Sequence, residues 1–317
     1  MASNCVTSIR STHLRLWGMA ALWGASWPWG RVIAQSMPPL AAASLRFVVA
    51  SLALLLWMHY RGGLQPVLRL RSKQWLGLTC AAAAGVFGYS TFFMLGVQLV
   101  PSGKASIVVT LNPAATLLLA ALLFGERLNA RILLGMALAV VGAWIAIAGG
   151  GSMGNWLEHT GRGELLLLGC VACWVAYTLM GRVVLKGLDA LTTTAVTSMI
   201  GAVMLGGLSL ALEGSSAWRQ LATAPLSSWG CLAALALGGT AMAYAWFFDG
   251  VKVLGAGAAA GYISLVPVFG ILFSSLWLGE ALPASLLLGG AIAVAGMATM
   301  HFARYGWPRR PALTAGG

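Results

Sequence analysis

The sequence predicts an all-α membrane protein: ten transmembrane helices, arranged as two inverted five-helix repeats around a central cavity. The first reason is composition, since 59% of the 317 residues are hydrophobic, 8% are charged and the mean hydropathy is +0.86. Such a chain has too little polar surface to cover a soluble globule of this length. The second reason is an internal repeat, because residues 93–140 recur as residues 247–294.

The repeat preserves the residues that punctuate a pair of membrane helices. The equivalent pairs are Gly96 and Gly250, Gly103 and Gly257, Pro113 and Pro267, Glu126 and Glu280, Gly135 and Gly289, and Gly142 and Gly296. Each half has an odd number of spans, so the second half must enter the bilayer upside down. Inverted repeats are typical of secondary transporters, whose substrate site lies near the membrane midplane.

Ten apolar runs are long enough to cross about 30 Å of hydrocarbon as helices. They cover residues 14–35, 40–58, 75–97, 102–124, 131–148, 164–184, 192–212, 229–249, 254–278 and 284–302. We therefore expect a cytoplasmic leader (1–13), a first repeat (14–148), a linker (149–163), a second repeat (164–303) and a cytoplasmic tail (304–317). The glycine-rich stretch that opens the linker predicts a flexible connection.

The distribution of the basic residues predicts the topology. Fourteen of the 19 Lys and Arg fall in the leader, the tail and the even-numbered connections. Arg31, Lys104, Arg162 and Arg219 fall on the other side, and Arg46 lies inside a span. This asymmetry predicts a multi-pass protein of the inner (plasma) membrane with both termini in the cytoplasm. The net charge of +12 thus indicates orientation in a lipid bilayer and no nucleic-acid partner.

Motifs of soluble enzymes are absent from the sequence. There is no P-loop, no Gly-x-Ser-x-Gly and no His-Glu-x-x-His, and the four histidines fall at or beyond the ends of spans. Cys170-x-x-Cys173 lies inside an apolar span without a second pair, so we interpret it as two small packing residues. We expect no enzyme activity, no metal, no cofactor and no disulfide.

The charged residues also bear on energy coupling. All seven carboxylates lie at or beyond the ends of the spans, so no acidic group at the bilayer centre is available as a proton relay. Facilitated diffusion down a gradient is therefore the favoured mode. Arg46 has three interpretations: a snorkelling structural anchor, which we favour, a partner of Glu280 or a backbone carbonyl, or a group that attracts a substrate carboxylate.

Several short motifs in both halves of the sequence resemble the repeated EamA domain of the drug/metabolite transporter superfamily. The resemblance rests on Ser44-Leu45-Arg46-Phe47, Leu111-Asn112-Pro113 and Gly125-Glu126-Arg127-Leu128, and on Pro267 and Gly279-Glu280-Ala281-Leu282 in the second copy. The resemblance covers nearly the whole chain. However, the second half has no counterpart of Arg46-Phe47, because Thr197-Ser198 stand at the corresponding place in the seventh span. The resemblance implies ten helices, a cavity lined by the first, third, fourth, sixth, eighth and ninth, and export of small metabolites, with bacterial amino-acid exporters as the most similar members.

Candidate substrate-binding residues are polar or aromatic side chains that lipid would disfavour. Their common feature is that related spans carry them at related depths, although an interfacial belt or ordinary helix packing also explains such rings. The aromatic and hydroxyl candidates are Trp23, Trp27, Tyr89, Phe93, Trp174, Tyr177, Thr178, Tyr244 and Phe248. Beside the mid-span prolines we add Asn112, Tyr262 and Ser264.

Pro113 and Pro267 are candidate gating residues. Each removes a backbone hydrogen bond near the middle of its span, so each predicts a kink that exposes polar backbone to a cavity, or a kink that merely shapes the bundle. Gly135 and Gly142 share one helix face, as do Gly289 and Gly296, which predicts close helix packing inside the chain rather than a dimer seam.

The predicted function follows from these features. We expect a monomeric transporter that exports amino acids, aromatic and other neutral ones, or similar small metabolites by alternating access. The alternatives are a multidrug exporter, possibly proton-coupled, and a nucleotide-sugar carrier. A channel or an intramembrane enzyme is disfavoured because neither a filter loop nor a catalytic constellation is visible.

Overall fold

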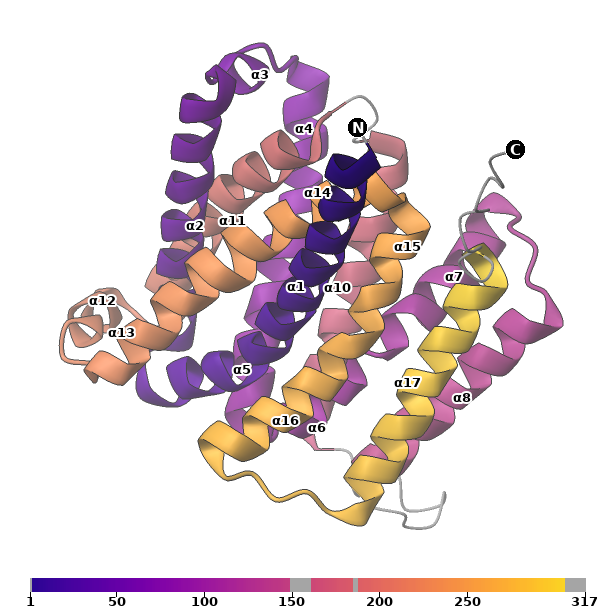
Figure 1. Ribbon diagram of the computed structural model, residues 1–317. Helices are drawn as coiled ribbons and strands as arrows, with labels where there is room; N and C mark the ends of the chain where they lie inside the picture. The colour runs from indigo at the N-terminus through magenta and orange to yellow at the C-terminus, as the bar shows by residue number, and fades with distance from the viewer. Residues whose placement is uncertain (1, 149–160, 185–187, 306–317) are drawn as a thin grey trace.

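The computed structural model of the protein describes residues 2–148, 161–184 and 188–305. Throughout these ranges the backbone forms helices joined by turns and short connections (Figure 1). Most of the predicted linker 149–163 and of the predicted tail 304–317 lies outside the described residues. The all-helical fold class is confirmed.

Helical segments of the first half follow the predicted spans to within a few residues, except that α1 begins well before its predicted start at residue 14 and includes most of the predicted leader. They are α1 (Ala2–Ser36), α2 (Pro39–Gly62), α3 (Gln65–Leu68), α4 (Ser72–Ala82), η1 (Ala83–Gly88), α5 (Tyr89–Leu99), α6 (Ser102–Val108), α7 (Leu111–Phe124) and α8 (Ala130–Ala148). The second half repeats the pattern. Its segments are α10 (Arg162–Val184), α11 (Ala190–Leu212), α12 (Ser215–Leu221), α13 (Leu226–Ala233), η3 (Ala234–Met242), α14 (Ala243–Leu254), α15 (Ala256–Gly261), η4 (Tyr262–Leu265), α16 (Val266–Leu278) and α17 (Ala284–Tyr305).

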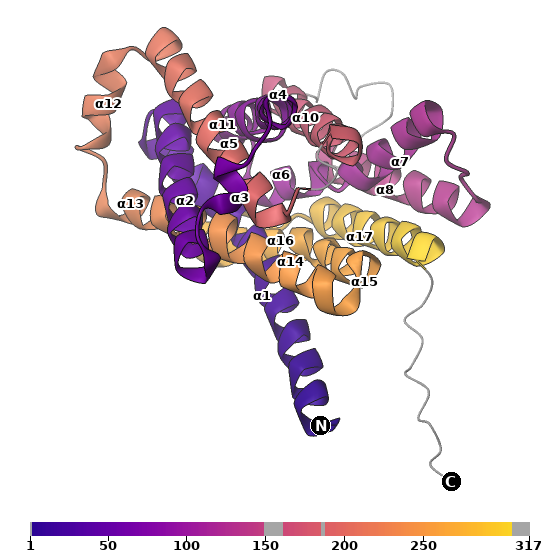
Figure 2. The same cartoon turned by 90° about the horizontal axis from the view of Figure 1, so that it is seen from above.

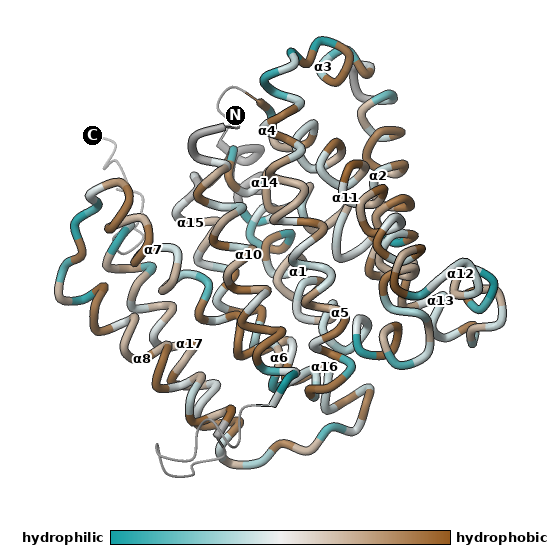
Figure 3. Tube along the Cα trace, turned by 180° about the vertical axis from the view of Figure 1, so that it is seen from behind, coloured by the Kyte–Doolittle hydropathy of each residue, from teal (hydrophilic) through white to brown (hydrophobic). Residues whose placement is uncertain are grey.

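Nine helices of the described part are long and apolar enough to cross a membrane. Hydrophobic residues cover their shafts, whereas hydrophilic residues gather at connections such as those around α3 and α12 (Figure 3). The predicted first span, α1, falls outside this set because it is rich in Trp and Gly and contains Arg31. It runs through the bundle against α5, α14 and α16, so much of its surface faces protein rather than lipid.

The contact between α1 and α16 depends on one glycine. A Cβ added to Gly24 would lie 2.3 Å from Cβ of Phe269 and 2.9 Å from the backbone nitrogen of Gly270. Any larger residue at position 24 would therefore push the two helices apart. This close approach joins the first helix of one half to a helix of the other half.

Four of the predicted spans are interrupted, at equivalent places in the two halves. In the fourth span α6 and α7 are separated by a turn at Val109 and Thr110, and in the ninth the 3-10 turn η4 separates α15 from α16. These two interruptions, in the fourth and ninth spans, directly precede Pro113 and Pro267. A proline nitrogen has no hydrogen to donate to the carbonyl four residues earlier. The predicted break at each proline is confirmed.

Two π-helical segments were not predicted from the sequence. η1 interrupts the third span between α4 and α5, and η3 interrupts the eighth between α13 and α14. A π turn widens the helix and displaces backbone carbonyls from their usual partners, and such turns are frequent at functional sites. The carbonyl of Gly239 in η3 accepts a hydrogen bond from Nε1 of Trp23 at 3.0 Å.

The fifth and tenth spans pack against each other through the glycine faces for which close packing was predicted. A Cβ on Gly142 would lie 2.4 Å from the backbone nitrogen of Ala293, and one on Gly289 would lie 2.5 Å from the backbone nitrogen of Ala146. The glycines thus bring α8 and α17 into backbone contact within one chain. Together with α7 they form a group at one side of the molecule in both perpendicular views (Figures 1 and 2).

Candidate functional site

A cavity of about 700 Å³ lies between helices of the two halves. The first half contributes side chains of α1, α2, α5 and α7, and the second half contributes side chains of α10, α11, α14, α16 and α17. Its size is within the range of small-molecule sites. The described residues of its wall include no Asp or Glu.

Most of the sequence-predicted site residues line this cavity. Those in the wall are Trp23, Trp27, Tyr89, Phe93, Asn112, Pro113, Trp174, Tyr177, Thr178, Tyr244, Ser264 and Pro267. They meet because helices of both halves turn these positions toward one interior space. That they bind substrate is still a prediction.

Two predicted residues do not line the cavity. Phe248 packs against Phe247 and Tyr244, at ring-centroid distances of 5.5 and 6.1 Å. The hydroxyl of Tyr262 is hydrogen-bonded to Nδ1 of His13 at 2.5 Å, because the 3-10 turn directs this side chain toward the start of α1. Both residues therefore lie outside the described wall of this cavity.

Aromatic rings in the wall form two contacting groups. On one side the ring of Tyr89 lies 5.9 Å from that of Trp174, which lies 5.9 Å from that of Tyr177. On the other, the rings of Trp23 and Tyr244 meet edge to face at 5.2 Å. Edge-to-face and tilted pairs of this kind are favourable and hold the rings in place. The wall is therefore a preformed aromatic surface.

The structure adds wall residues that were not among the candidate substrate-binding residues, although Arg46 was already considered as a group that attracts a substrate carboxylate. They come from three helices outside the predicted lining: Arg46 and Phe47 of α2, Thr194, Thr197 and Ser198 of α11, and Met297, Met300 and His301 of α17. The threonine-rich start of α11 was an available signal, because residues 194, 197 and 198 share one helix face and such hydroxyls are unusual against lipid. The α17 residues offered no comparable pattern.

Asn112 and Arg46 carry buried polar atoms without a partner. Oδ1 of Asn112 and Nε of Arg46 are each buried and form no hydrogen bond within the described structure. Of the interpretations considered for Arg46, the pair with Glu280 is not formed, because Glu280 pairs with Arg31. Unsatisfied polar atoms are rare in folded proteins. The described structure has two more, Nε1 of Trp144 and of Trp218, but those residues lie outside the cavity wall.

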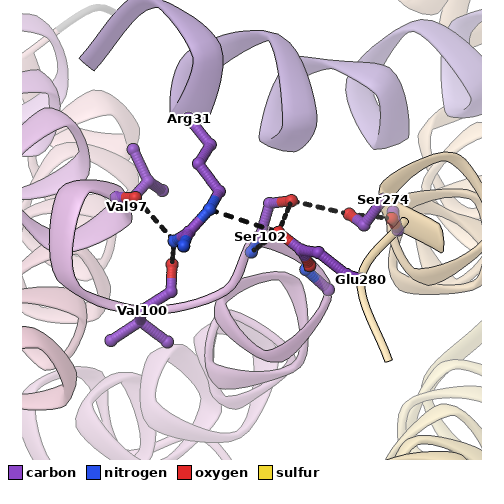
Figure 4. A network of polar contacts seen from close by, with 8 residues as sticks. Arg31, Val97, Val100, Ser102, Ser274 and Glu280 are labelled. Carbon is purple, nitrogen blue, oxygen red and sulfur yellow. Dashed lines mark hydrogen bonds and ion pairs between the residues drawn. The ribbon is translucent and has the colours of Figure 1, made fainter. Parts of the chain in front are cut away.

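One end of the bundle is closed by a polar network centred on Glu280, just after α16 (Figure 4). Its carboxylate accepts hydrogen bonds from the backbone N–H groups of Ser102 and Gly103 at 2.8 and 2.9 Å, at the start of α6. Nε of Arg31 lies 3.3 Å from the same carboxylate. The Arg31 guanidinium also donates to the carbonyls of Val97 and Val100, so α1, α5 and α6 are joined to the end of α16.

The other end of the cavity is open. Its wall there includes His301, Arg304 and Tyr305 at the end of α17, of which the last two are exposed. Nη2 of Arg304 lies 2.9 Å from the carboxylate of Glu126, the repeat counterpart of Glu280. The N-terminus of α1 and the end of α17 lie on the same side of the molecule, which is therefore the side on which the cavity opens (Figure 1).

The described residues offer no metal site, since no group of three His, Cys, Asp or Glu side chains is close enough to hold an ion. Cys170 and Cys173 are free thiols, and the sulfur of Cys170 lies 3.6 Å from the carbonyl of Tyr89. Their environment is that of small packing residues. The candidate site is thus a cavity for a small molecule, built from protein groups.

Comparison with known proteins identifies the family. Residues 12–148 and residues 161–302 each match the EamA-like transporter family. The chain belongs to this family. Its members are transporters and not enzymes, so the cavity lies in a multi-pass membrane transporter.

Related proteins agree with the family assignment along nearly the whole chain. An uncharacterized transporter of Bacillus subtilis, YyaM, is 25% identical over 287 residues, covering 90% of this chain and 92% of its own. The inner membrane transporter YedA of Escherichia coli, also uncharacterized, is 27% identical over 303 residues, which cover 94% of this chain and 93% of YedA. A probable terminal-alkyne amino-acid exporter of Streptantibioticus cattleyicolor is 28% identical over 295 residues, with 93% and 94% covered.

A solved crystal structure shares the fold. It superposes with a TM-score of 0.61 at 24% identity and covers 92% of this chain and 96% of its own. The closed end is held by side chains and backbone groups of both halves.

Proposed function

We propose that this protein exports amino acids, aromatic and other neutral ones, or similar small metabolites, by alternating access. The observation that carries the proposal is the cavity wall, which combines preformed aromatic surface with unpaired polar atoms on Arg46 and Asn112. A small molecule with an apolar side chain and a polar head fits such a wall, because each part meets groups of its own kind. The similarity to a probable amino-acid exporter supports the same substrate class.

Facilitated diffusion is the proposed mode of transport. The described wall contains no carboxylate, and Glu126 is paired with the wall residue Arg304. A proton-coupled exporter needs an ionisable group that alternates between the two sides at membrane depth. Efflux therefore depends on the concentration gradient of the substrate alone.

The alternative substrates fit the wall less well. Lipophilic cations favour a buried carboxylate as counter-ion, whereas the charged group at the described wall's centre is the cation Arg46. The phosphates of a nucleotide sugar require several free cations, but Arg304 is already paired. A neutral or zwitterionic substrate is consistent with both observations.

Topology and gating complete the proposal. Both termini lie in the cytoplasm by the distribution of basic residues, so the cavity opens inward and the Glu280 network closes the outer side. We further propose that the protein works as a monomer in the inner membrane, that Pro113 and Pro267 mark the bending helices, and that the amino-acid exporter YddG is its functional counterpart.

The decisive experiment is counterflow in proteoliposomes. Purified protein is reconstituted and loaded with unlabelled phenylalanine, and entry of labelled amino acids is compared with entry of labelled sugars and cationic dyes. We expect exchange of neutral and aromatic amino acids without any pH or sodium gradient. Exchange of dyes but not of amino acids, or accumulation driven by an imposed proton gradient, would contradict the substrate and the coupling respectively.

A further inference from the structure

Arg46 is held in the cavity wall by contacts that leave its charge uncompensated. Nη2 donates a hydrogen bond to Oγ1 of Thr240 at 3.1 Å, and Cζ lies 4.5 Å from the centre of the Phe47 ring. Nε is buried without a partner. A hydroxyl and a ring orient the guanidinium, but neither neutralises it.

The carboxylates in the described part of the chain are engaged elsewhere. Among the described residues, the ion pairs are Glu126 with Arg304, Glu164 with Lys104, Asp249 with Arg15 and Glu280 with Arg31. Asp189 accepts the backbone N–H of Thr192 at the start of α11, and Glu213 accepts those of Leu40 and Ala41 at the start of α2. A desolvated charge without a partner is costly at membrane depth, so an anion from outside the chain would be stabilised here.

We propose that Arg46 binds the carboxylate of the transported molecule and thereby makes a single carboxylate a requirement for recognition. The guanidinium offers planar N–H donors that match a carboxylate, and its unpaired Nε is one of them. This inference rests on the proposed function and narrows it, because amines without a carboxylate are excluded while the aromatic wall accepts the remainder of the substrate.

The asymmetry of the repeat limits the charge of the substrate. The corresponding place in α11 is occupied by Thr197 and Ser198, which also face the cavity but carry no charge. Arg304, the other arginine of the described wall, is paired at the open end. One carboxylate can therefore be neutralised in the cavity, which favours monocarboxylates and monoamino monocarboxylic acids over dicarboxylates.

Three ligands that share a phenyl ring separate the roles of the charged groups. Phenylalanine has a carboxylate and an amine, 3-phenylpropionate has the carboxylate alone, and phenylethylamine has the amine alone. Binding to the purified full-length protein in detergent is measured by calorimetry. We expect both acids to bind and the amine to bind at least about tenfold more weakly, the size of one lost charge-assisted hydrogen bond.

Arg46→Gln and Arg219→Gln form a matched pair of variants. Arg219 is exposed on α12, so its substitution makes the same change of net charge away from the cavity. We expect Arg46→Gln to raise the Kd of both acids roughly ten- to a hundredfold and to leave the amine unaffected, and we expect Arg219→Gln to match the wild type. Arg46→Lys keeps the charge but not the planar fork, so intermediate Kd values are expected.

Thermal unfolding of each variant shows whether it is folded. If Arg46→Gln is not folded, the test depends on Arg46→Lys and on the affinities of the wild type for the three ligands. Equal binding of the amine and the acids by the wild type, or unchanged acid binding in a folded Arg46 variant, overturns the proposal. Arg46-dependent binding of 3-phenylpropionate without amino-acid counterflow retains the carboxylate site and rejects the amino-acid assignment. Amino-acid counterflow that persists in Arg46→Gln retains the amino-acid assignment and rejects the carboxylate site.

Discussion

Replacing Glu280 by glutamine is predicted to open the closed end of the cavity. The carboxylate accepts from Ser102 N–H and Oγ–H through one oxygen and from Gly103 N–H through the other, and it pairs with Arg31. Glutamine has the same shape but a single acceptor oxygen. The NH2 of its side-chain amide would replace one of the two oxygens and would point at a backbone N–H of Ser102 or Gly103. Two donors cannot bond to each other, so at least one N–H at the start of α6 would be left unpaired.

The magnitude follows from those contacts. Leaving a buried donor unsatisfied costs about 1–3 kcal/mol. The partly exposed ion pair with Arg31 contributes up to about 1 kcal/mol more. A loss of roughly 1–4 kcal/mol from the closed state shifts the ratio of closed to open molecules by about 5- to 1000-fold, since these contacts are broken when that end opens.

A single cysteine in the cavity provides the assay. Thr178→Cys is introduced after the five natural cysteines are replaced, and its labelling by a membrane-impermeant reagent is measured from the side opposite the termini. We expect Glu280→Gln to raise the labelling rate strongly. The measurement requires that both variants remain folded in the membrane.

Glu213→Gln is the matched control for this experiment. Glu213 also accepts two backbone N–H groups at a helix start, those of Leu40 and Ala41 at 2.8 and 2.9 Å, but it joins the end of α11 to α2 and makes no contact with the Glu280 network. It should weaken α2 without exposing position 178. An unchanged labelling rate in Glu280→Gln, or an equal increase in Glu213→Gln, would refute the role of Glu280 as a closing contact.

Three further predictions concern the wall, the helix breaks and the glycine faces. Tyr89→Ala or Trp174→Ala should reduce phenylalanine counterflow at least about tenfold with little loss of folded protein, because the rings face the cavity; normal counterflow, or loss of folding in both, would favour a packing role. Pro113→Ala and Pro267→Ala should both slow transport, and labelling at Thr178→Cys should shift in opposite senses because the prolines lie in opposite halves; identical shifts would mean that they only shape the bundle. Gly142→Val should lower the free energy of unfolding by about 2 kcal/mol or more, since its Cβ would meet the backbone of α17. Gly207→Val, which has open space at its Cβ, should leave the free energy of unfolding unchanged. Equal melting temperatures of the two variants would contradict the packing.

The sequence by itself determined the elements of this protein and much of its cavity. Helix number and position follow from apolar run length, because lipid leaves the backbone no other partner than its own helix. The breaks before Pro113 and Pro267 follow from the missing proline N–H, and close packing at Gly142 and Gly289 follows from their absent side chains, although only the structure showed that α8 and α17 are the two partners. These are local properties, so they can be predicted from residue type and spacing.

Only the tertiary structure decided how the polar groups are partnered and which end is closed. Arg31, counted in the sequence as one basic residue of an outer connection, proved to pair with Glu280 from the other half, which left Arg46 uncompensated. Tyr262 was taken out of the wall by a 3-10 turn, and α2, α11 and α17 were brought into it. Contacts between residues so distant along the chain depend on how whole helices pack, and no local pattern encodes which of several donors a given carboxylate will meet.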